Sequence, residues 1–416
     1  MQLRVNSYSI RDIFSIGIDT RFFLLILPVF ISAGKWYISG LFILILFAGF
    51  ILFTDYRKVV FREFSVWIWI LLWSFYILMK SPVIYQGIIY FDFNYPDKLY
   101  DAVSYFSGTV LVPFMIFTIV TNVVLDEEFM NQLFEIFNIC AIGLSFYSIY
   151  QFISIGGIIT DKIRIAGFWG DLNIISAFLG IIFLFNLAFV TNRLRNEKIV
   201  LKLVTMLIVL IPIYLSQTRA VWLSMIFVLF FYGLRKPKVL LISIIMIGIT
   251  SVIFWKLIVY KLLTVVYFQY DISTIGRLQA WYTSLLILKD NFLFGNGFDS
   301  FFYLKDDYFS GFLVFVPHSH NTYLRSLVET GLIGAIPVYY LFFSTFIKTY
   351  KMSSSDDLFY RKYGTAFTLM FITLSIVFIF EPFFSLYSNS STFIWFFIAL
   401  AYQLNIQRND LISGVT

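Results

Sequence analysis

The stretch IISAFLGIIFLFNLAFVT, residues 174–191, carries no charged side chain and is almost entirely apolar. A helix that crosses a bilayer needs about 20 mainly apolar residues, so this stretch has the character of one membrane span. Similar stretches recur along the whole chain. The sequence therefore predicts an all-α, polytopic transmembrane bundle of about twelve spans, near residues 20–34, 36–54, 64–79, 103–124, 133–155, 174–191, 199–216, 219–234, 239–259, 321–347, 363–383 and 388–404.

Composition supports the same fold class. Of the 416 residues, 60% are hydrophobic and 13% are charged, whereas soluble domains carry about 25% charged residues. We expect the net charge of +6 to set orientation and to meet anionic head groups, not to bind nucleic acid. Cys140 is the sole cysteine, which excludes an intrachain disulfide. The polar, mixed first residues predict no cleavable signal peptide, and residues 1–416 are interpreted as a single integral membrane domain.

Basic residues gather in alternate connections between the predicted spans, at 57–62, 193–202, 235–238 and 348–362. Short cytoplasmic loops are enriched in Lys and Arg, so these connections and both termini are predicted to be cytoplasmic. The longest connection, 260–320, is then an extracytoplasmic loop. One connection disagrees, because Asp126, Glu127 and Glu128 fall on the predicted cytoplasmic side without a basic neighbour.

The stretch HSHNTYLRSLVETGLIG, residues 318–334, contains the only two histidines of the chain, at the edge of a predicted span. A membrane-edge histidine is usually an imidazole that hydrogen-bonds a loop carbonyl. Here Asn321 or Thr322 can cap the following helix, whose positive end favours a neutral ring at His320. A neutral imidazole can act as a general base, so His320 is the predicted catalytic residue.

A metal site is the alternative interpretation of the same stretch. In an extended segment, His318 and His320 would share a face, and Asp306 and Asp307 could supply oxygen ligands. No third ligand stands at a spacing typical of zinc, which makes the metal site the weaker hypothesis. We therefore predict neither a metal nor a cofactor.

Two arginines stand on the predicted outer side, against the basic-inside trend. Arg219 lies in SQTRAVW, in a tight turn between two spans, and Arg277 begins a stretch whose apolar residues recur at helical spacing. That stretch predicts an interfacial helix within the 260–320 loop. Either arginine could be a cation that extends to the head groups, as a lysine would. Planar guanidinium groups, however, fit a diphosphate better than ammonium groups do.

The same side collects further polar residues. RIAGFWGDLN, residues 164–173, joins two spans, and Asn173 is predicted to cap the second of them or to form part of a structural turn. Glu381 ends another span, and a carboxylate so close to hydrocarbon usually has a partner, such as an arginine of the site. The candidate substrate-binding residues are Arg164, Asn173, Arg219, Arg277, His318, Asn321 and Glu381.

These groups suit one reaction: displacement at a carbon whose leaving group is a lipid diphosphate. The arginines would stabilise the charge that develops on the leaving group, and His320 would accept the proton of the attacking hydroxyl.

At this point the residues resemble the O-antigen ligase and O-antigen polymerase superfamily of bacterial surface-polysaccharide assembly. Its signature of His, then Asn, Ser or Gln, nine residues and Gly-x-x-Gly is similar to His320-Asn321 followed by Gly331 to Gly334. Its Thr-x-Ser/Thr-Arg stretch resembles residues 217–220. Further similar elements are Arg164, Gly167 and Asn173, then Gly276-Arg277 and Trp281, and then the turn 291–297, in which Phe292 replaces the usual proline. The resemblance covers about residues 160–390.

The resemblance implies an inverting, metal-independent glycosyltransferase of the bacterial inner membrane, with its active site facing the periplasm or exterior. It implies an undecaprenyl-diphosphate-linked oligosaccharide as donor. His320 would be the base, and Arg219 and Arg277 the diphosphate binders, while His318 has no matching role. Expected partners are membrane lipids, a glycan acceptor, a flippase and a chain-length regulator.

The motifs leave the acceptor open. A polymerase transfers the growing chain to a new lipid-linked repeat unit, whereas a ligase transfers it to lipid A–core. Polymerase is favoured because that branch of the superfamily is the larger and more diverse one. A flippase or other transporter is the distant alternative. Transporters usually place ionisable residues and broken helices near mid-bilayer, often in repeats, whereas the predicted spans show no ionisable residue at their middle and the sequence shows no repeat.

Overall fold

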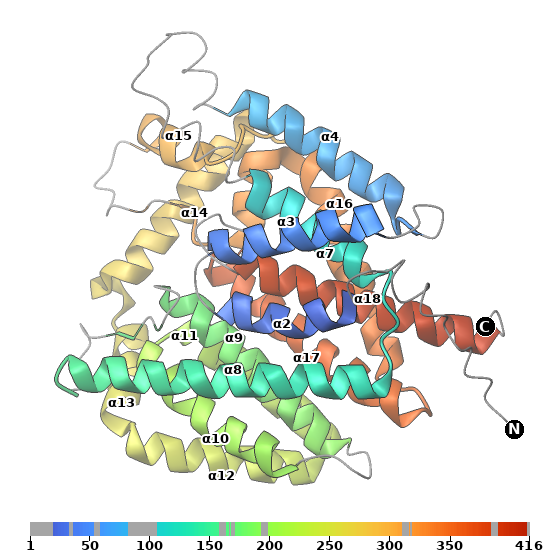
Figure 1. Ribbon diagram of the computed structural model, residues 1–416. Helices are drawn as coiled ribbons and strands as arrows, with labels where there is room; N and C mark the ends of the chain where they lie inside the picture. The colour runs from blue at the N-terminus through green and yellow to red at the C-terminus, as the bar shows by residue number, and fades with distance from the viewer. Residues whose placement is uncertain are drawn as a thin grey trace, which may run out of the picture.

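The computed structural model describes residues 20–32, 36–53, 59–81, 106–157, 164–165, 167, 171–192, 199–309, 316, 318–383 and 390–413. Over these residues the chain is helical and contains no strand (Figure 1). The elements are α2 (Thr20–Ser32), α3 (Trp36–Phe53), α4 (Phe64–Lys80), the π-helix η1 (Ser107–Leu111), α7 (Val112–Val120), α8 (Glu127–Ser154), α9 (Leu172–Thr191), α10 (Ile199–Ser216), α11 (Arg219–Arg235), α12 (Pro237–Ile253), α13 (Trp255–Val266), the 3₁₀-helix η3 (Phe268–Tyr270), α14 (Ile272–Asp290), α15 (Ser300–Tyr308), α16 (Thr322–Met352), α17 (Leu358–Phe380) and α18 (Ser390–Ser413).

Five of the described helices are long and apolar enough to cross a membrane: α8, α9, α10, α16 and α17. Shorter apolar helices accompany them, α2 and α4 among others. The prediction of an all-helical, multi-pass membrane protein is confirmed, whereas the count of twelve spans stays a prediction. One predicted span was wrong, because the helix expected over 239–259 is broken at Phe254 into α12 and α13.

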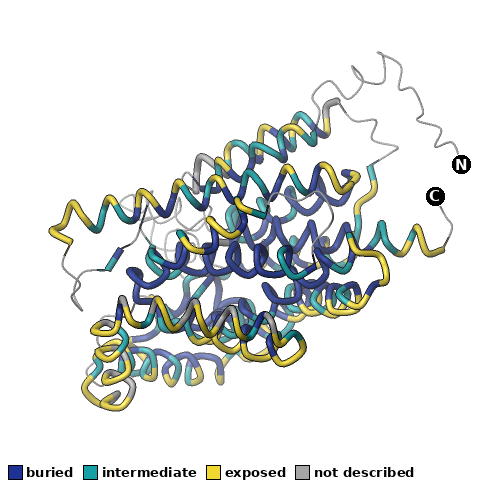
Figure 2. The backbone as a smooth tube through the Cα atoms, turned by 90° about the horizontal axis from the view of Figure 1, so that it is seen from below, coloured by how far each residue is buried: buried dark blue, intermediate teal, exposed yellow. Residues whose placement is uncertain are grey.

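The centre of the bundle is built from aromatic side chains. Phe134 of α8 meets Phe185 and Phe189 of α9 edge to face, each with ring centroids 5.1 Å apart, and it also contacts Phe367 of α17 and Phe397 of α18. Lipid tails are as apolar as these rings, so close packing and ring geometry hold the helices together. Figure 2 shows the buried backbone in the middle of the bundle and exposed stretches along its outer helices.

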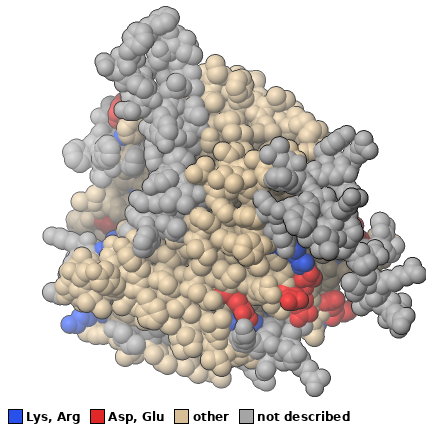
Figure 3. All heavy atoms as spheres, viewed as in Figure 1, with Lys and Arg blue, Asp and Glu red and all other residues tan. Residues whose placement is uncertain are grey.

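The outer helices present large apolar side chains. Leu72 of α4, Phe146 of α8 and Ile245 of α12 are each at least half exposed. The coloured part of the face in Figure 3 is mostly uncharged, with small acidic and basic clusters. A surface of this kind suits contact with lipid tails.

We expected the segment 260–320 to be mainly loop around one interfacial helix. Its described residues instead include part of α13 and all of η3, α14 and α15. α14 begins at Ile272, a full turn before Arg277, and so extends the helix predicted there. Its small residues, Gly276 and Ala280 among them, are buried, while Leu278 and Leu285 are about half exposed. The helix therefore has one face against the protein and one apolar face outward.

Gly331, the first glycine of the signature, lies where two segments approach closely. α16 is interrupted at Gly331, where φ is 64°, and its free carbonyls at Val328 and Glu329 accept from the backbone amides of Asn296 and Gly297 at 2.9 and 3.0 Å. A Cβ at Gly331 would lie 2.3 Å from the oxygen of Leu293. Only glycine fits this close approach, so the 291–297 turn and the start of α16 hold one another.

The acidic connection that disagreed with the orientation rule has a basic neighbour in space. Asp126 caps α8 through the amide of Phe129 and pairs with Arg21, a residue far away in sequence. The connection thus lacks a basic neighbour in the sequence but has one in the fold, because charge pairing between helices does not depend on sequence distance.

Candidate active site

His320 stands immediately before α16, in a left-handed backbone conformation with φ of 47°. Asn321 is the N-cap, and its side-chain oxygen accepts from the amide of Leu324 at 2.9 Å, as the sequence predicted. The hydroxyl of Thr322 donates to the carbonyl of Glu381 at 2.6 Å and accepts from the amide of Phe383 at 2.9 Å. These contacts fix the end of α17 beside the start of α16.

The two histidine rings lie against one another, with centroids 4.2 Å apart at 65°. The rings are thus neighbours, although the backbone at His320 is left-handed and not extended, as the shared face was expected to require. Burial, followed by the charges of the neighbouring His320, Arg325 and Arg277, lowers the pKa of His318 from 6.5 to about 2. His318 is therefore a neutral ring behind His320. Neither Nδ1 atom has a hydrogen-bond partner among the described residues.

Glu381 is the group on which the other side chains converge. Its Oε1 accepts from Nη2 of Arg277 at 2.9 Å, and its Oε2 accepts from Nδ2 of Asn173 at 2.8 Å. The same Oε2 lies 3.7 Å from Nδ1 of His320. The side chain of Glu381 is only 4% exposed. The expectation that this carboxylate has an arginine partner is confirmed.

Arg219 is the first residue of α11. Its Nη2 donates to Oδ2 of Asp271 at 2.7 Å and lies 3.4 Å from the hydroxyl of Thr274. Burial opposes ionisation of Asp271, but the hydrogen bonds from Thr274 and Arg219 outweigh it and lower the pKa of that carboxyl. Arg219 is thus held by an anionic partner in α14, and its side chain stays 27% exposed.

Arg277 bridges α14 and α17. Its Nη1 donates to the hydroxyl of Ser273 at 2.7 Å, one turn earlier, while Nη2 binds Glu381. Its buried Nε makes no hydrogen bond with the described residues. The guanidinium group therefore retains donor capacity on one edge.

The connection before α9 contributes Arg164, whose Nε donates to the carbonyl of Ser216 at 3.0 Å. Asp171 caps α9 by accepting from the amides of Asn173 and Ile174 at 2.8 and 3.2 Å, so the predicted capping role of Asn173 was wrong. Asn173 instead accepts from Thr218 at 3.2 Å while it donates to Glu381. Burial raises the pKa of Asp171. Gly167 and Gly170 of the stretch 164–173 were expected to permit a tight turn, and Gly170 lies outside the described residues.

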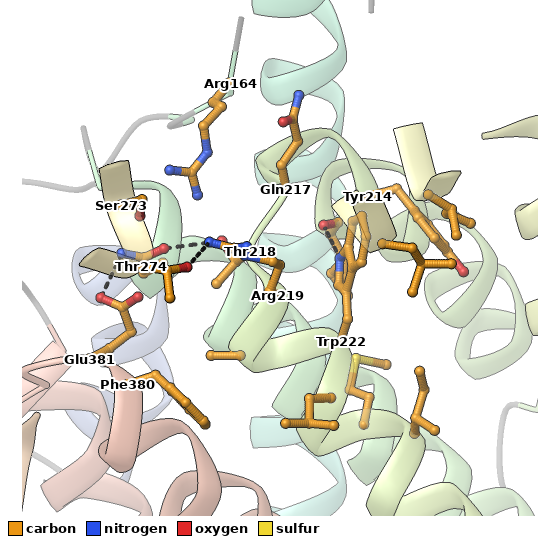
Figure 4. A pocket seen from close by; sticks show the side chains of 18 of the residues that line it. Arg164, Tyr214, Gln217, Thr218, Arg219, Trp222, Ser273, Thr274, Phe380 and Glu381 are labelled. Carbon is orange, nitrogen blue, oxygen red and sulfur yellow. Dashed lines mark hydrogen bonds between the residues drawn. The ribbon is translucent and has the colours of Figure 1, made fainter. Parts of the chain in front are cut away.

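A cavity of about 990 Å³ joins these groups. At one end its wall carries three arginines, Arg164, Arg219 and Arg277, and two carboxylates, Asp271 and Glu381, which sum to a formal charge of +1. In Figure 4 the guanidinium of Arg164 points toward this polar end, and Tyr214 and Trp222 lie on the other side of Arg219. Burial lowers the pKa of Arg164, and the charges of Glu381, Arg277 and Arg219 also act on it.

The rest of the cavity wall is mainly apolar. Leu210 of α10, Leu229 of α11 and Ile258 of α13 line it. Leu223 of α11 and Leu262 of α13 line it as well, and each is more than half exposed. His318 and His320 do not line the cavity, but Nδ1 of His320 lies 3.7 Å from Oε2 of Glu381, which does.

The structure thus brings His320, Arg164, Asn173, Arg219, Arg277 and Glu381 together, and sets His318 and Asn321 just behind them. Sequence reasoning missed Asp271 and Thr218. Asp271 directly precedes the stretch that begins α14, in a position typical of helix N-caps, and this signal could have found it. Thr218 lies within the stretch that resembles the family's Thr-x-Ser/Thr-Arg motif, directly before the arginine, and this was its signal.

The alternative metal ligands are not gathered at this site. Asp306 and Asp307 are exposed on α15. Within the described part of the chain, no three His, Cys, Asp or Glu side chains form a group that could hold a metal ion. Metal independence stays a prediction that needs its own test.

Chemically, the arrangement provides cationic donors at the mouth of an apolar channel and an imidazole next to them. Such a site can hold an amphiphile by its anionic head and place a proton acceptor at the edge of that head.

Comparison with known proteins supports the resemblance found in the motifs. No curated protein matches the chain. Residues 203–339 match a family model described as O-antigen ligase, a stretch that includes Arg219, Arg277 and the whole histidine signature. Over this part of the chain, the resemblance to the O-antigen ligase and polymerase superfamily inferred from the motifs is confirmed.

Proposed function

We propose that the protein is an inverting, metal-independent glycosyltransferase whose donor is a glycan linked to undecaprenyl diphosphate. One observation carries the proposal: arginines from three separate segments, residues 164, 219 and 277, face a single cavity whose wall away from this polar end is mainly apolar. A diphosphate needs several fixed cationic donors, and a polyprenyl chain needs an apolar channel open to the bilayer.

In this assignment Arg219 and Arg277 bind the diphosphate, with Arg164 and Asn173 at its edge. His320 accepts the proton of the attacking hydroxyl, as its place beside the polar end of the cavity allows. Asn321 and His318 support His320 from behind, the first as helix cap and the second as a neutral ring in contact with it.

We place the site on the outer face of a bacterial inner membrane, with both termini in the cytoplasm. α11 and α16 begin at the site and end near Arg235 and Lys351, so these basic residues lie at the opposite end of the bundle. Figure 1 likewise shows α14 and the C-terminal end of α18 at opposite sides of the molecule. Basic residues at one end favour that end as cytoplasmic.

Of the two acceptors, we favour a second lipid-linked repeat unit, which makes the enzyme a polymerase of a surface polysaccharide. A ligase would use the same donor site with lipid A–core as acceptor. The two reactions give different products: a polymerase yields a ladder of lipid-linked chains, whereas a ligase yields one transfer per acceptor.

The test is a transfer assay with purified protein in nanodiscs, a synthetic undecaprenyl-diphosphate oligosaccharide, and each acceptor in turn. We expect release of undecaprenyl diphosphate together with chain extension. His320→Ala should abolish transfer but retain donor binding, and His318→Ala should have the smaller effect. Full activity of His320→Ala would remove the base assignment, and equal, complete loss in both variants would favour a shared metal site.

A further inference from the structure

Glu381 hydrogen-bonds Arg277 and Asn173 and nearly contacts His320. Of these, Arg277 and His320 have different roles in the proposed reaction. Arg277, a diphosphate binder, donates to Oε1 at 2.9 Å. Nδ1 of His320, on the ring of the base, lies 3.7 Å from Oε2, which is beyond hydrogen-bond distance. In this structure the carboxylate therefore accepts from Arg277 at Oε1 and from Asn173 at Oε2, and it makes no hydrogen bond with the histidine.

His320 lacks a hydrogen bond at the nitrogen that faces Glu381. Nδ1 of His320 is buried and makes no hydrogen bond with the described residues. A buried polar atom without a partner is unfavourable, and the carboxylate oxygen of Glu381 lies within about 1 Å of hydrogen-bond distance from it. Contacts of catalytic groups are often long in ligand-free proteins and shorten when the substrate is bound.

We infer that Glu381 is a positioning residue that exchanges partners: it holds Arg277 in the empty site and holds His320 once a diphosphate has taken the arginine. The inference rests on the proposed function and adds a residue to it. A diphosphate in the cavity offers Arg277 a more highly charged acceptor than the carboxylate. The released carboxylate then accepts a hydrogen bond from Nδ1–H of His320.

The exchange determines which nitrogen of His320 is the base. With the proton on Nδ1 and directed at Glu381, the unprotonated Nε2 faces the acceptor. The acceptor oxygen bonds to the anomeric carbon, and the bond from that carbon to the diphosphate oxygen breaks. The electron pair leaves on the diphosphate, and the hydroxyl proton passes to Nε2. Glu381 stabilises the resulting imidazolium, so donor binding and base activation are coupled.

Kinetics distinguish this role from a purely structural one. Glu381→Gln keeps the shape of the side chain but weakens its hold on both partners. We expect turnover to fall about 10- to 100-fold, by analogy with the groups that orient metal-bound histidines. We also expect the half-saturating donor concentration to fall, because Arg277 no longer has to leave a carboxylate. A structural defect would raise that concentration, and such a rise with lower turnover would overturn the inference.

Asp126→Asn is the matched control, because Asp126 is also a carboxylate paired with an arginine but lies outside the cavity. It should leave both kinetic parameters of the enzyme unchanged. Glu381→Asp keeps the charge on a shorter side chain and should recover part of the turnover. Recovery no better than that of Glu381→Gln would speak against a carboxylate that acts on His320.

A second measurement needs no substrate. The chain has only two histidines, so ¹⁵N-histidine labelling reports two rings, which single substitutions assign. Arg277→Gln frees Glu381 as the diphosphate would, and should place a proton on Nδ1 of His320. The double variant Arg277→Gln/Glu381→Gln should lose that state. Identical His320 signals in the single and double variants would overturn the inference.

The two levels of proposal fail differently. If the wild-type protein released no undecaprenyl diphosphate in the transfer assay, the proposed function would fail, and the ¹⁵N measurement would still decide whether Glu381 controls the His320 ring. If transfer occurred but Glu381→Gln lost turnover and donor affinity together, the glycosyltransferase assignment would stand and Glu381 would be a structural residue only.

Discussion

The arginine clamp gives the sharpest test of the proposed mechanism, through the substitutions Arg219→Lys and Arg277→Lys. Arg277 already uses two nitrogens on different oxygens, Nη1 on Ser273 and Nη2 on Glu381. Arg219 reaches Asp271 through Nη2 at 2.7 Å. A lysine keeps the positive charge but replaces this planar fork by a single nitrogen, so it cannot hold two oxygens of a diphosphate in fixed geometry.

The expected loss of turnover depends on the stage of the reaction at which the arginine–diphosphate contact is strongest. Charge builds on the diphosphate as the bond to sugar breaks, so the lost donor is missed most in the transition state. Removal of one donor of this kind costs about 2.7–4 kcal/mol, or about 10²–10³ in turnover. Two independent sites would sum to about 5–8 kcal/mol, but we expect less in the double variant, because both arginines hold the same anion.

The assay is transfer kinetics with a synthetic lipid-diphosphate donor for wild type, both single variants and the double variant. Turnover should fall more than donor binding weakens, as is typical of a contact that strengthens in the transition state. Arg21→Lys is the control, because Arg21 pairs with Asp126 outside the cavity. Near-wild-type turnover in both single variants would refute the clamp and reduce these residues to membrane-edge cations.

Three further outcomes are expected. Transfer should persist in excess EDTA, and loss of activity that a divalent cation restores would revive the metal hypothesis. Through His318, the free energy of unfolding should fall by about 1.4 kcal/mol between pH 7.5 and 5.5. The pKa of His318 is 6.5 in the unfolded chain and about 2 in the folded protein, so in this range its ring gains a proton only in the unfolded chain. Thermal melts of His318→Gln should lack this loss of stability. Gly331→Ala should destabilise the protein by about 1–3 kcal/mol, because the new residue is strained at φ 64° and its Cβ meets the backbone of Leu293. Gly143→Ala is the control and should not destabilise it, because a Cβ there meets nothing within 4 Å.

The helices and the main charged groups of the site could be predicted from sequence because each depends on local information. An apolar run reports a buried or lipid-facing helix whichever neighbours it has, as α10 shows by matching its predicted bounds at both ends. An arginine or histidine among so few polar residues is conspicuous for the same reason. The break at Phe254 was missed, because apolar residues continue through it and no Gly or Pro marks it.

Partner choice was out of reach, since it depends on residues brought together by the fold. Asp171 and Asn173 can both cap a helix, and their sequence neighbours do not decide between them. In the fold, the side-chain amide of Asn173 donates to Glu381, which is 208 positions away in the sequence. Asp171 caps the helix instead, by accepting from the backbone amide of Asn173. The pairing of Gly331 with the 291–297 turn is hidden for the same reason.

The two carboxylates of the cavity explain how a site with three arginines can stay folded without its ligand. Like charges around one space repel, and burial beside apolar walls strengthens that repulsion. Asp271 and Glu381 offset it by pairing with Arg219 and Arg277, leaving the cavity wall near +1. An arriving diphosphate competes with these pairs, so its net binding is weaker than its contacts alone would give. Within the proposed function, that exchange makes Glu381 available to His320 only when a donor is present, so the base is activated only when the leaving group is in place.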